Sequence, residues 1–185
     1  APNGDFTIYI AGLYEATYAS TGTLLDTKVY YAFAGKVVAM RDNDTLYYLH
    51  TDHLGSTRVV TGSNGQPVSL NSYYPFGASK YASGARPTDM DFTGQLLDGT
   101  GLNFYNARYY DSAIGRFISA DTIVPDPSGT QGFNRYAYSY NNPLKFTDPT
   151  GHDPCSGKPD VYVPDCGVSI LTLIEPLVFT QREPL

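Results

Sequence analysis

Short runs of alternating apolar and polar residues, separated by turn residues, fill most of this chain. Such alternation is typical of β-strands with one buried face. The runs recur roughly every 8–12 residues, a spacing that favours stacked antiparallel strands over a βαβ arrangement. The predicted strands are residues 5–10, 13–19, 27–33, 36–41, 46–50, 57–61, 67–74, 94–97 and 102–110.

Turn signals between these runs predict hairpins. Asn64-Gly65 is a strong signal for a hairpin turn, and Ala34-Gly35 joins two further strands. Helix is scarce: a short helical turn is expected at 131–136, and Pro143 and Pro149 prevent a long helix later. The fold class is therefore all-β, built from stacked antiparallel hairpins, with short helical turns near the C-terminal part.

Composition supports a sheet protein and excludes several partners. The chain has 17 Tyr, no Trp and only 16% charged residues, against about 25% in an average globular protein. The net charge of −6 comes without a basic stripe, so no nucleic-acid partner is expected. No apolar run reaches the ~18 residues that a membrane-spanning helix needs. No cofactor is expected, because no phosphate-binding glycine loop precedes a helix.

Six motifs occur in order along the chain, and together they resemble RHS/YD-repeat proteins. They include FTGQ, NARYYD and GRFISAD and span residues 47–61, 73–77, 92–95, 106–111, 115–121 and 134–152. The resemblance implies a long β-strip that spirals into a hollow shell, closed by an RHS repeat-associated core domain. It divides the chain into YD-repeat-like hairpins (1–91), the core (92–152) and a variable tail (153–185).

The same resemblance implies a candidate site. Asp148-Pro149-Thr150-Gly151 looks like the DPxG motif after which some family members cut themselves by aspartyl chemistry. Two carboxylates that share a proton are the physical requirement. By motif position these are Asp121 and Asp148, with Arg116 as the orienting cation, and the bond cut follows His152, where the family often carries Leu. The alternative is structural: Arg116 pairs with Asp121 or Asp148 to pin the closing strands, and both carboxylates cap turns.

Other candidates carry less chemistry. Cys155 and Cys166 flank a Pro/Gly/Asp-rich loop and are expected to form a disulfide in an oxidising compartment. His50 and His53 are three residues apart, which on a strand directs them to opposite faces, so no metal site is expected. Adjacent tyrosines, such as Tyr109-Tyr110, are expected to pack on opposite faces of a sheet rather than form a sugar platform.

Three functions are compatible with these features. The favoured hypothesis is a secreted or cell-surface structural module that self-assembles into a filament or surface polymer through its sheet edges, aided by an apolar tail strand at 168–179. The second is the C-terminal plug of an RHS toxin shell that cuts itself after His152, with the parent shell lying upstream. The third is an adhesion module that binds carbohydrate or protein through exposed Tyr. A start at Ala1 suggests a processed product or fragment.

Overall fold

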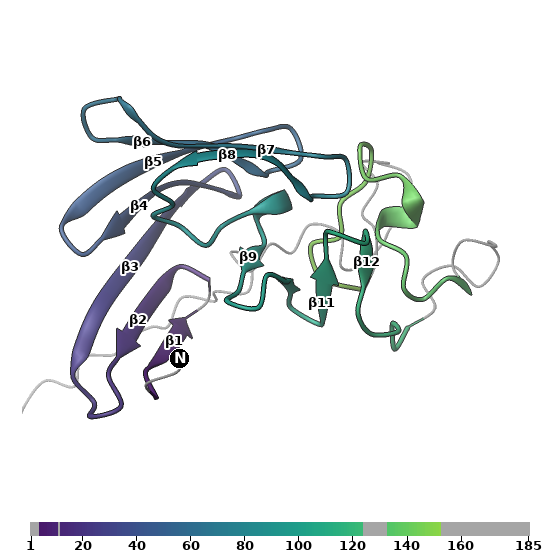
Figure 1. Ribbon diagram of the computed structural model, residues 1–185, viewed down its shortest axis with the longest axis horizontal. Helices are drawn as coiled ribbons and strands as arrows, with labels where there is room; N and C mark the ends of the chain where they lie inside the picture. Colours follow the sequence, from purple (N-terminus) through teal and green to yellow (C-terminus); the bar gives the residue numbers. More distant parts are fainter. Residues whose placement is uncertain (1–3, 11, 124–132, 153–185) are drawn as a thin grey trace, which may run out of the picture.

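The computed structural model describes residues 4–10, 12–123 and 133–152, and within them the strands form two antiparallel sheets (Figure 1). The larger sheet has eight strands in sequence order, and the smaller has four in the order β12-β11-β10-β9. The expected all-β fold is confirmed. Cys155, Cys166 and the apolar tail segment at 168–179 lie outside the described residues.

The larger sheet is a continuous meander. Each strand pairs with the next one in sequence, so the chain turns back at every hairpin without a crossover. Its strands are β1 (Phe6–Ile10), β2 (Tyr14–Tyr18), β3 (Leu24–Phe33), β4 (Lys36–Asp42), β5 (Thr45–Thr51), β6 (Thr57–Gly62), β7 (Pro67–Tyr73) and β8 (Ser79–Gly84).

The predicted hairpin turns are confirmed. Ala34 and Gly35 both have positive φ, 49° and 75°, as the turn between β3 and β4 requires. Gly65 lies between β6 and β7 with φ 77°, and the Asn64 side chain accepts a hydrogen bond from the Gln66 N–H. The strand at 79–84 was not predicted. Its sequence, SKYASG, has little apolar alternation, and all of its residues are exposed.

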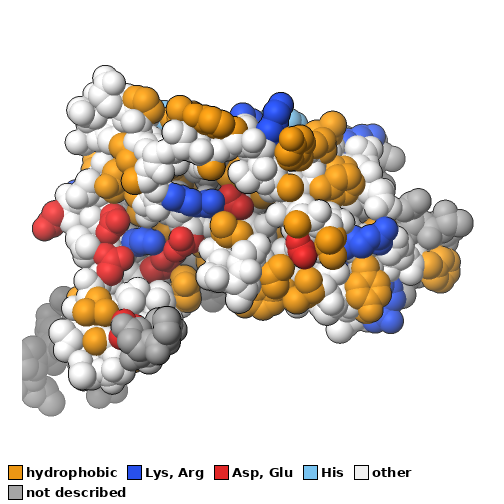
Figure 2. Space-filling model, in the orientation of Figure 1, with side chains coloured by type: hydrophobic (Ala, Val, Ile, Leu, Met, Phe, Trp, Pro, Cys, Tyr) orange, Lys and Arg blue, Asp and Glu red, His pale blue; other side chains and the backbone are white. Residues whose placement is uncertain are grey.

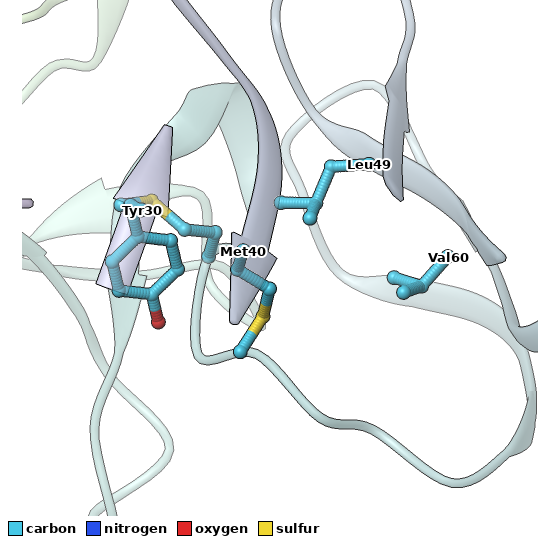
Figure 3. Packing of buried hydrophobic residues seen from close by; sticks show 5 residues of the cluster. Tyr30, Met40, Leu49 and Val60 are labelled. Atoms are coloured by element: carbon cyan, nitrogen blue, oxygen red, sulfur yellow. The ribbon is translucent and has the colours of Figure 1, made fainter. Parts of the chain in front are cut away.

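One face of the larger sheet carries the first core. Tyr30 pairs with Met40 across β3 and β4, and Leu49 pairs with Val60 across β5 and β6, so these side chains share a face. All four are buried and pack with Met90 (Figure 3). The adjacent tyrosines separate as expected: Tyr30 is 3% exposed, whereas Tyr31 is 44% exposed.

The smaller sheet carries the second core, which is aromatic. This sheet consists of β9 (Leu96–Leu97), β10 (Asn103–Tyr105), β11 (Arg108–Asp111) and β12 (Arg116–Phe117). Aromatic rings meet here at centroid distances of 4.7–6.5 Å, mostly in tilted or edge-on pairs. The buried members are Phe92, Tyr105, Tyr110, Phe117 and Tyr138.

One predicted strand needs correction, and one predicted turn lies partly outside the described residues. The single strand expected at 102–110 is two strands, β10 and β11, because Asn106 adopts a positive φ of 60° and turns the chain. The helical turn expected at 131–136 begins outside the described residues. The described 3-10 turns are Phe92–Gly94 and Ser139–Asn141.

The buried Asp91 links the two sheets. Its Oδ1 accepts a hydrogen bond from the Tyr73 hydroxyl on β7 at 2.6 Å, and its Oδ2 accepts one from the Asn103 amide on β10 at 3.1 Å. Arg86 Nη2 adds an ion pair at 2.8 Å. The carboxylate thus fixes the smaller sheet, which carries the candidate site, against the larger one.

Candidate functional site

Three buried charged side chains meet beside the aromatic core: Arg108, Asp121 and Asp148. Arg108 opens β11, opposite Tyr105 on β10. Its Nη2 lies 2.7 Å from Asp121 Oδ2 and 3.5 Å from Asp148 Oδ2. One guanidinium nitrogen therefore faces both carboxylates that the sequence singled out.

The remaining donors of Arg108 bind backbone oxygens. Its Nε donates to the carbonyl of Gly151, and its Nη1 donates to the carbonyl of Arg135 at 2.8 Å. The guanidinium carbon lies 3.7 Å from the centre of the Phe117 ring. Burial lowers the pKa of Arg108, while Asp121 and Asp148 act in the opposite direction. Arg108 is thus a fixed cation held between the two carboxylates.

The turn 148–152 wraps around the Asp148 carboxyl group. Asp148 Oδ1 accepts hydrogen bonds from the N–H groups of Thr150 at 3.3 Å, Gly151 at 2.8 Å and His152 at 3.2 Å. Burial nevertheless raises the pKa of Asp148 to about 6, although Gly151, Arg108, Thr150 and His152 all favour the charged form. Asp148 can therefore carry a proton at mildly acidic pH.

The two carboxylate oxygens of Asp121 have different partners. Its Oδ1 accepts hydrogen bonds from the Ile123 N–H at 2.9 Å and from His152 Nδ1 at 2.8 Å. Its Oδ2 is buried and has no hydrogen-bond donor among the described residues. The 2.7 Å contact with Arg108 is an ion pair outside hydrogen-bond geometry. Oδ2 therefore faces the guanidinium group of Arg108.

Gly151 allows the turn to reach Arg108. Its φ is +79°, and a Cβ atom here would lie 2.2 Å from the carbonyl oxygen of Tyr105. Only glycine fits both conditions. The turn is also held by the Asn106 amide, which donates to the Pro149 carbonyl at 2.9 Å, and by the Ala107 N–H, which donates to the Thr150 carbonyl at 3.2 Å.

The structure brings Asp121 and Asp148 together but leaves Arg116 outside the cluster. Arg116 precedes the buried Phe117 on β12, so strand alternation points it outward, where its Nη1 lies 3.5 Å from Asn134 Oδ1. Arg108 occupies the place expected for Arg116. One feature of the sequence could have identified Arg108: it lies two residues from the apolar Tyr110, so the two side chains share a strand face.

Other sequence candidates lie elsewhere. His50 Nε2 lies 3.0 Å from the Thr61 hydroxyl. Within the part of the chain that the structure describes, no group of three His, Cys, Asp or Glu side chains could hold a metal ion. Nor do the described residues contain a helix that is long and apolar enough to cross a membrane.

Comparison with known proteins identifies the family. The sequence model of the Teneurin YD-shell family matches residues 11–144. The chain belongs to the RHS/YD-repeat family. This YD-shell chain is 32% identical to the toxin subunit YenC1 of Yersinia entomophaga over 166 residues, which cover 80% of the chain and 16% of the relative. It is 31% identical to the tRNA3(Ser)-specific nuclease WapA of Bacillus spizizenii over 68% of the chain and 6% of that protein.

A solved structure shows the same architecture. The YD-shell chain superposes with a TM-score of 0.65 and 27% identity on a chain from the crystal structure of TcdB2-TccC3-Cdc42, covering 80% of this chain and 8% of that one. The chain therefore spans less than a fifth of the length of these relatives. It is an RHS/YD shell-type domain related to toxin-complex subunits.

Proposed function

We propose that this chain forms the closing part of an RHS/YD shell and cuts itself after His152. The observation that carries the proposal is the junction of two buried carboxyl groups with the turn that precedes the expected cleavage point. Asp148 holds the His152 N–H, and Asp121 holds the His152 side chain. Both acids therefore contact the residue that would supply the reacting carbonyl.

The two carboxyl groups suit different roles. Asp121 Oδ2 faces a fixed cation and lacks a hydrogen-bond donor among the described residues, so it is the candidate base for the attacking water. Asp148, whose pKa is raised by burial to about 6, is the candidate acid. Hydroxide adds to the His152 carbonyl carbon, the carbon–nitrogen bond to residue 153 breaks, and Asp148 supplies the proton to the departing nitrogen. Arg108 keeps the carboxyl groups in place.

The test is the mass of the purified chain. We expect a product ending at His152 and a released fragment 153–185. Asp121→Asn and Asp148→Asn should each stop the cut, because each removes one proton-transfer group while preserving shape. Asp111→Asn, on the same strand as Arg108 but outside the cluster, is the matched control. A cut that persists in both cluster variants would show that another agent is responsible.

The pH dependence adds a second criterion. Because Asp148 must be protonated to act as the acid, the rate should fall about tenfold per pH unit well above the pKa of about 6 that burial gives this group. A rate that rises steadily from pH 6 to 8 would contradict the assigned role of Asp148.

Self-assembly is a second candidate function, and the two outer strands of the larger sheet favour it. The edge strand β1 exposes four large apolar side chains, Phe6, Ile8, Tyr9 and Ile10, and β8 at the opposite edge is exposed throughout. Hydrophobic side chains also reach the surface across the face shown in Figure 2. Exposed edges of this kind pair with further strands. In a shell these come from neighbouring repeats; in a filament they come from another copy.

Sedimentation separates these two uses of the edges. Assembly through copies predicts concentration-dependent growth that Ile8→Lys on β1 reduces, with Ser63→Lys at an exposed turn residue as the charge control. A monomer at micromolar concentration would exclude the filament.

The proposal also includes a location outside the cell that produces the chain. The similarity to the toxin subunit YenC1 supports this location. Adhesion through exposed Tyr side chains stays a prediction, which a glycan-binding screen would test.

A further inference from the structure

His152 contacts both acids of the candidate site, one through its backbone and one through its side chain. Its N–H donates to Asp148 Oδ1 at 3.2 Å, and its Nδ1 lies 2.8 Å from Asp121 Oδ1. An ionised carboxylate has only acceptor atoms, so Nδ1 must be the donor of the second contact. The imidazole is half-buried, whereas the Asp121 side chain is 2% exposed.

The contact fixes the rotation of the Asp121 carboxylate. Oδ1 has two donors, the Ile123 N–H and the His152 imidazole, which approach from different parts of the chain. With Oδ1 held from both sides, Oδ2 is directed toward Arg108 and stays without a donor among the described residues. Removing the imidazole leaves Oδ1 with the Ile123 N–H.

We propose that the His152 side chain is a positioning residue for self-cleavage, which aligns Asp121 with the peptide bond that follows His152. This inference rests on the proposed self-cleavage. A residue next to the reacting bond thereby takes part in arranging the base that attacks that bond. In this chain, unlike family members with Leu at the same place, the cut should prefer at position 152 a side chain that can donate a hydrogen bond from the place of Nδ1.

Two substitutions at position 152 distinguish an effect of the hydrogen bond that positions Asp121 from an effect of side-chain size. His152→Leu puts an apolar side chain of similar size in place of the imidazole and has no donor, whereas the amide nitrogen of His152→Asn can occupy the place of Nδ1. We expect the leucine variant to release fragment 153–185 about tenfold more slowly, the effect of losing one hydrogen bond to a charged group. The asparagine variant should recover most of the rate. Equal rates for the natural chain and the leucine variant, or a slow asparagine variant with a fast leucine variant, would overturn the proposal.

A spectroscopic measurement tests the contact without cleavage. Asp148→Asn removes the acid but keeps Oδ1 as an acceptor for the turn, so the chain stays intact. In this background, nitrogen-15 spectra should show the proton of neutral His152 on Nδ1, and adding Asp121→Leu should move it to Nε2. Thermal unfolding of each variant verifies folding.

The two measurements distinguish the possible failures. If the Nδ1 proton is present but no variant cuts, the self-cleavage proposal fails while the contact stands. If the chain cuts but the proton resides on Nε2 in both backgrounds, the positioning role of His152 is refuted while self-cleavage stands.

Discussion

Replacing Asp148 with Asn should make the stability difference between variant and natural chain depend on pH. The amide side chain retains Oδ1, which accepts three backbone hydrogen bonds in the turn, and the substitution removes only the ionisable group. Burial raises the pKa of Asp148 from 3.8 to about 6 in the folded protein. The folded state therefore binds the Asp148 proton more tightly than the unfolded state does.

The sign and size follow from proton linkage. A carboxyl group with a raised folded pKa contributes stability that is fully present below the unfolded pKa and is lost as pH rises through the folded pKa. Since each pKa unit corresponds to about 1.4 kcal/mol, the shift is worth about 3 kcal/mol. Relative to the asparagine variant, the natural chain should lose about this amount between pH 4 and pH 7. The difference should be constant above pH 7.

Urea unfolding followed by circular dichroism at pH 4, 5, 6, 7 and 8 measures this difference directly. Comparing the two proteins at each pH cancels the titration of the groups that they share. Asp121→Asn in both proteins prevents the proposed cut, mass spectrometry verifies that both then have the same length, and Asp44→Asn at an exposed turn controls for the change in net charge. A pH-independent difference would refute the argument. So would a variant that becomes progressively less stable than the natural chain as pH rises, since Asp148 would then favour folding in its charged form.

Two further substitutions test how the cluster is held. Arg108→Leu should destabilise the fold by about 3–5 kcal/mol in urea unfolding, because it leaves two buried carboxylates without their cation; Arg116→Leu should cost less than about 1 kcal/mol, and equal effects would contradict the assignment of Arg108. Gly151→Ala should stop release of fragment 153–185, because its Cβ would lie 2.2 Å from a backbone oxygen. Gly65→Ala, where φ is +77° but nothing lies within 4 Å, should cost only the backbone strain of about 1 kcal/mol and leave release unchanged.

The sequence predicted the larger sheet well because its physics is local. Alternating residues and short turns determine both strand and hairpin. The Ala34-Gly35 turn pairs Phe33 with Lys36, and a β-bulge between Tyr31 and Ala32 then shifts the register of β3 with β4 by one residue. The missed strand β8 lacks apolar alternation and is held mainly by pairing with β7. The break in 102–110 depends on a positive φ at Asn106, which propensity alone does not require.

The candidate site was predicted only in part, because its members come together through tertiary contacts. Motif position led to Asp121 and Asp148, and Arg116, which shares the GRFISAD motif with Asp121, was expected to be the orienting cation. Strand alternation reverses that choice: Phe117 occupies the buried face of β12, so its neighbour Arg116 faces outward, while Arg108 shares the buried face of β11 with Tyr110. The strand face on which an arginine lies, rather than its distance along the chain, decides whether it reaches a buried carboxylate.

The geometry of Arg108 also explains why a structural and a chemical role need not exclude each other here. Its Nε and Nη1 bind the carbonyls of Gly151 and Arg135, which fixes the turn and the preceding segment against β11. Its Nη2 alone faces the two carboxylates. Because different nitrogens of Arg108 make the two kinds of contact, the arginine can fix the turn and hold the two acids of the candidate site at the same time.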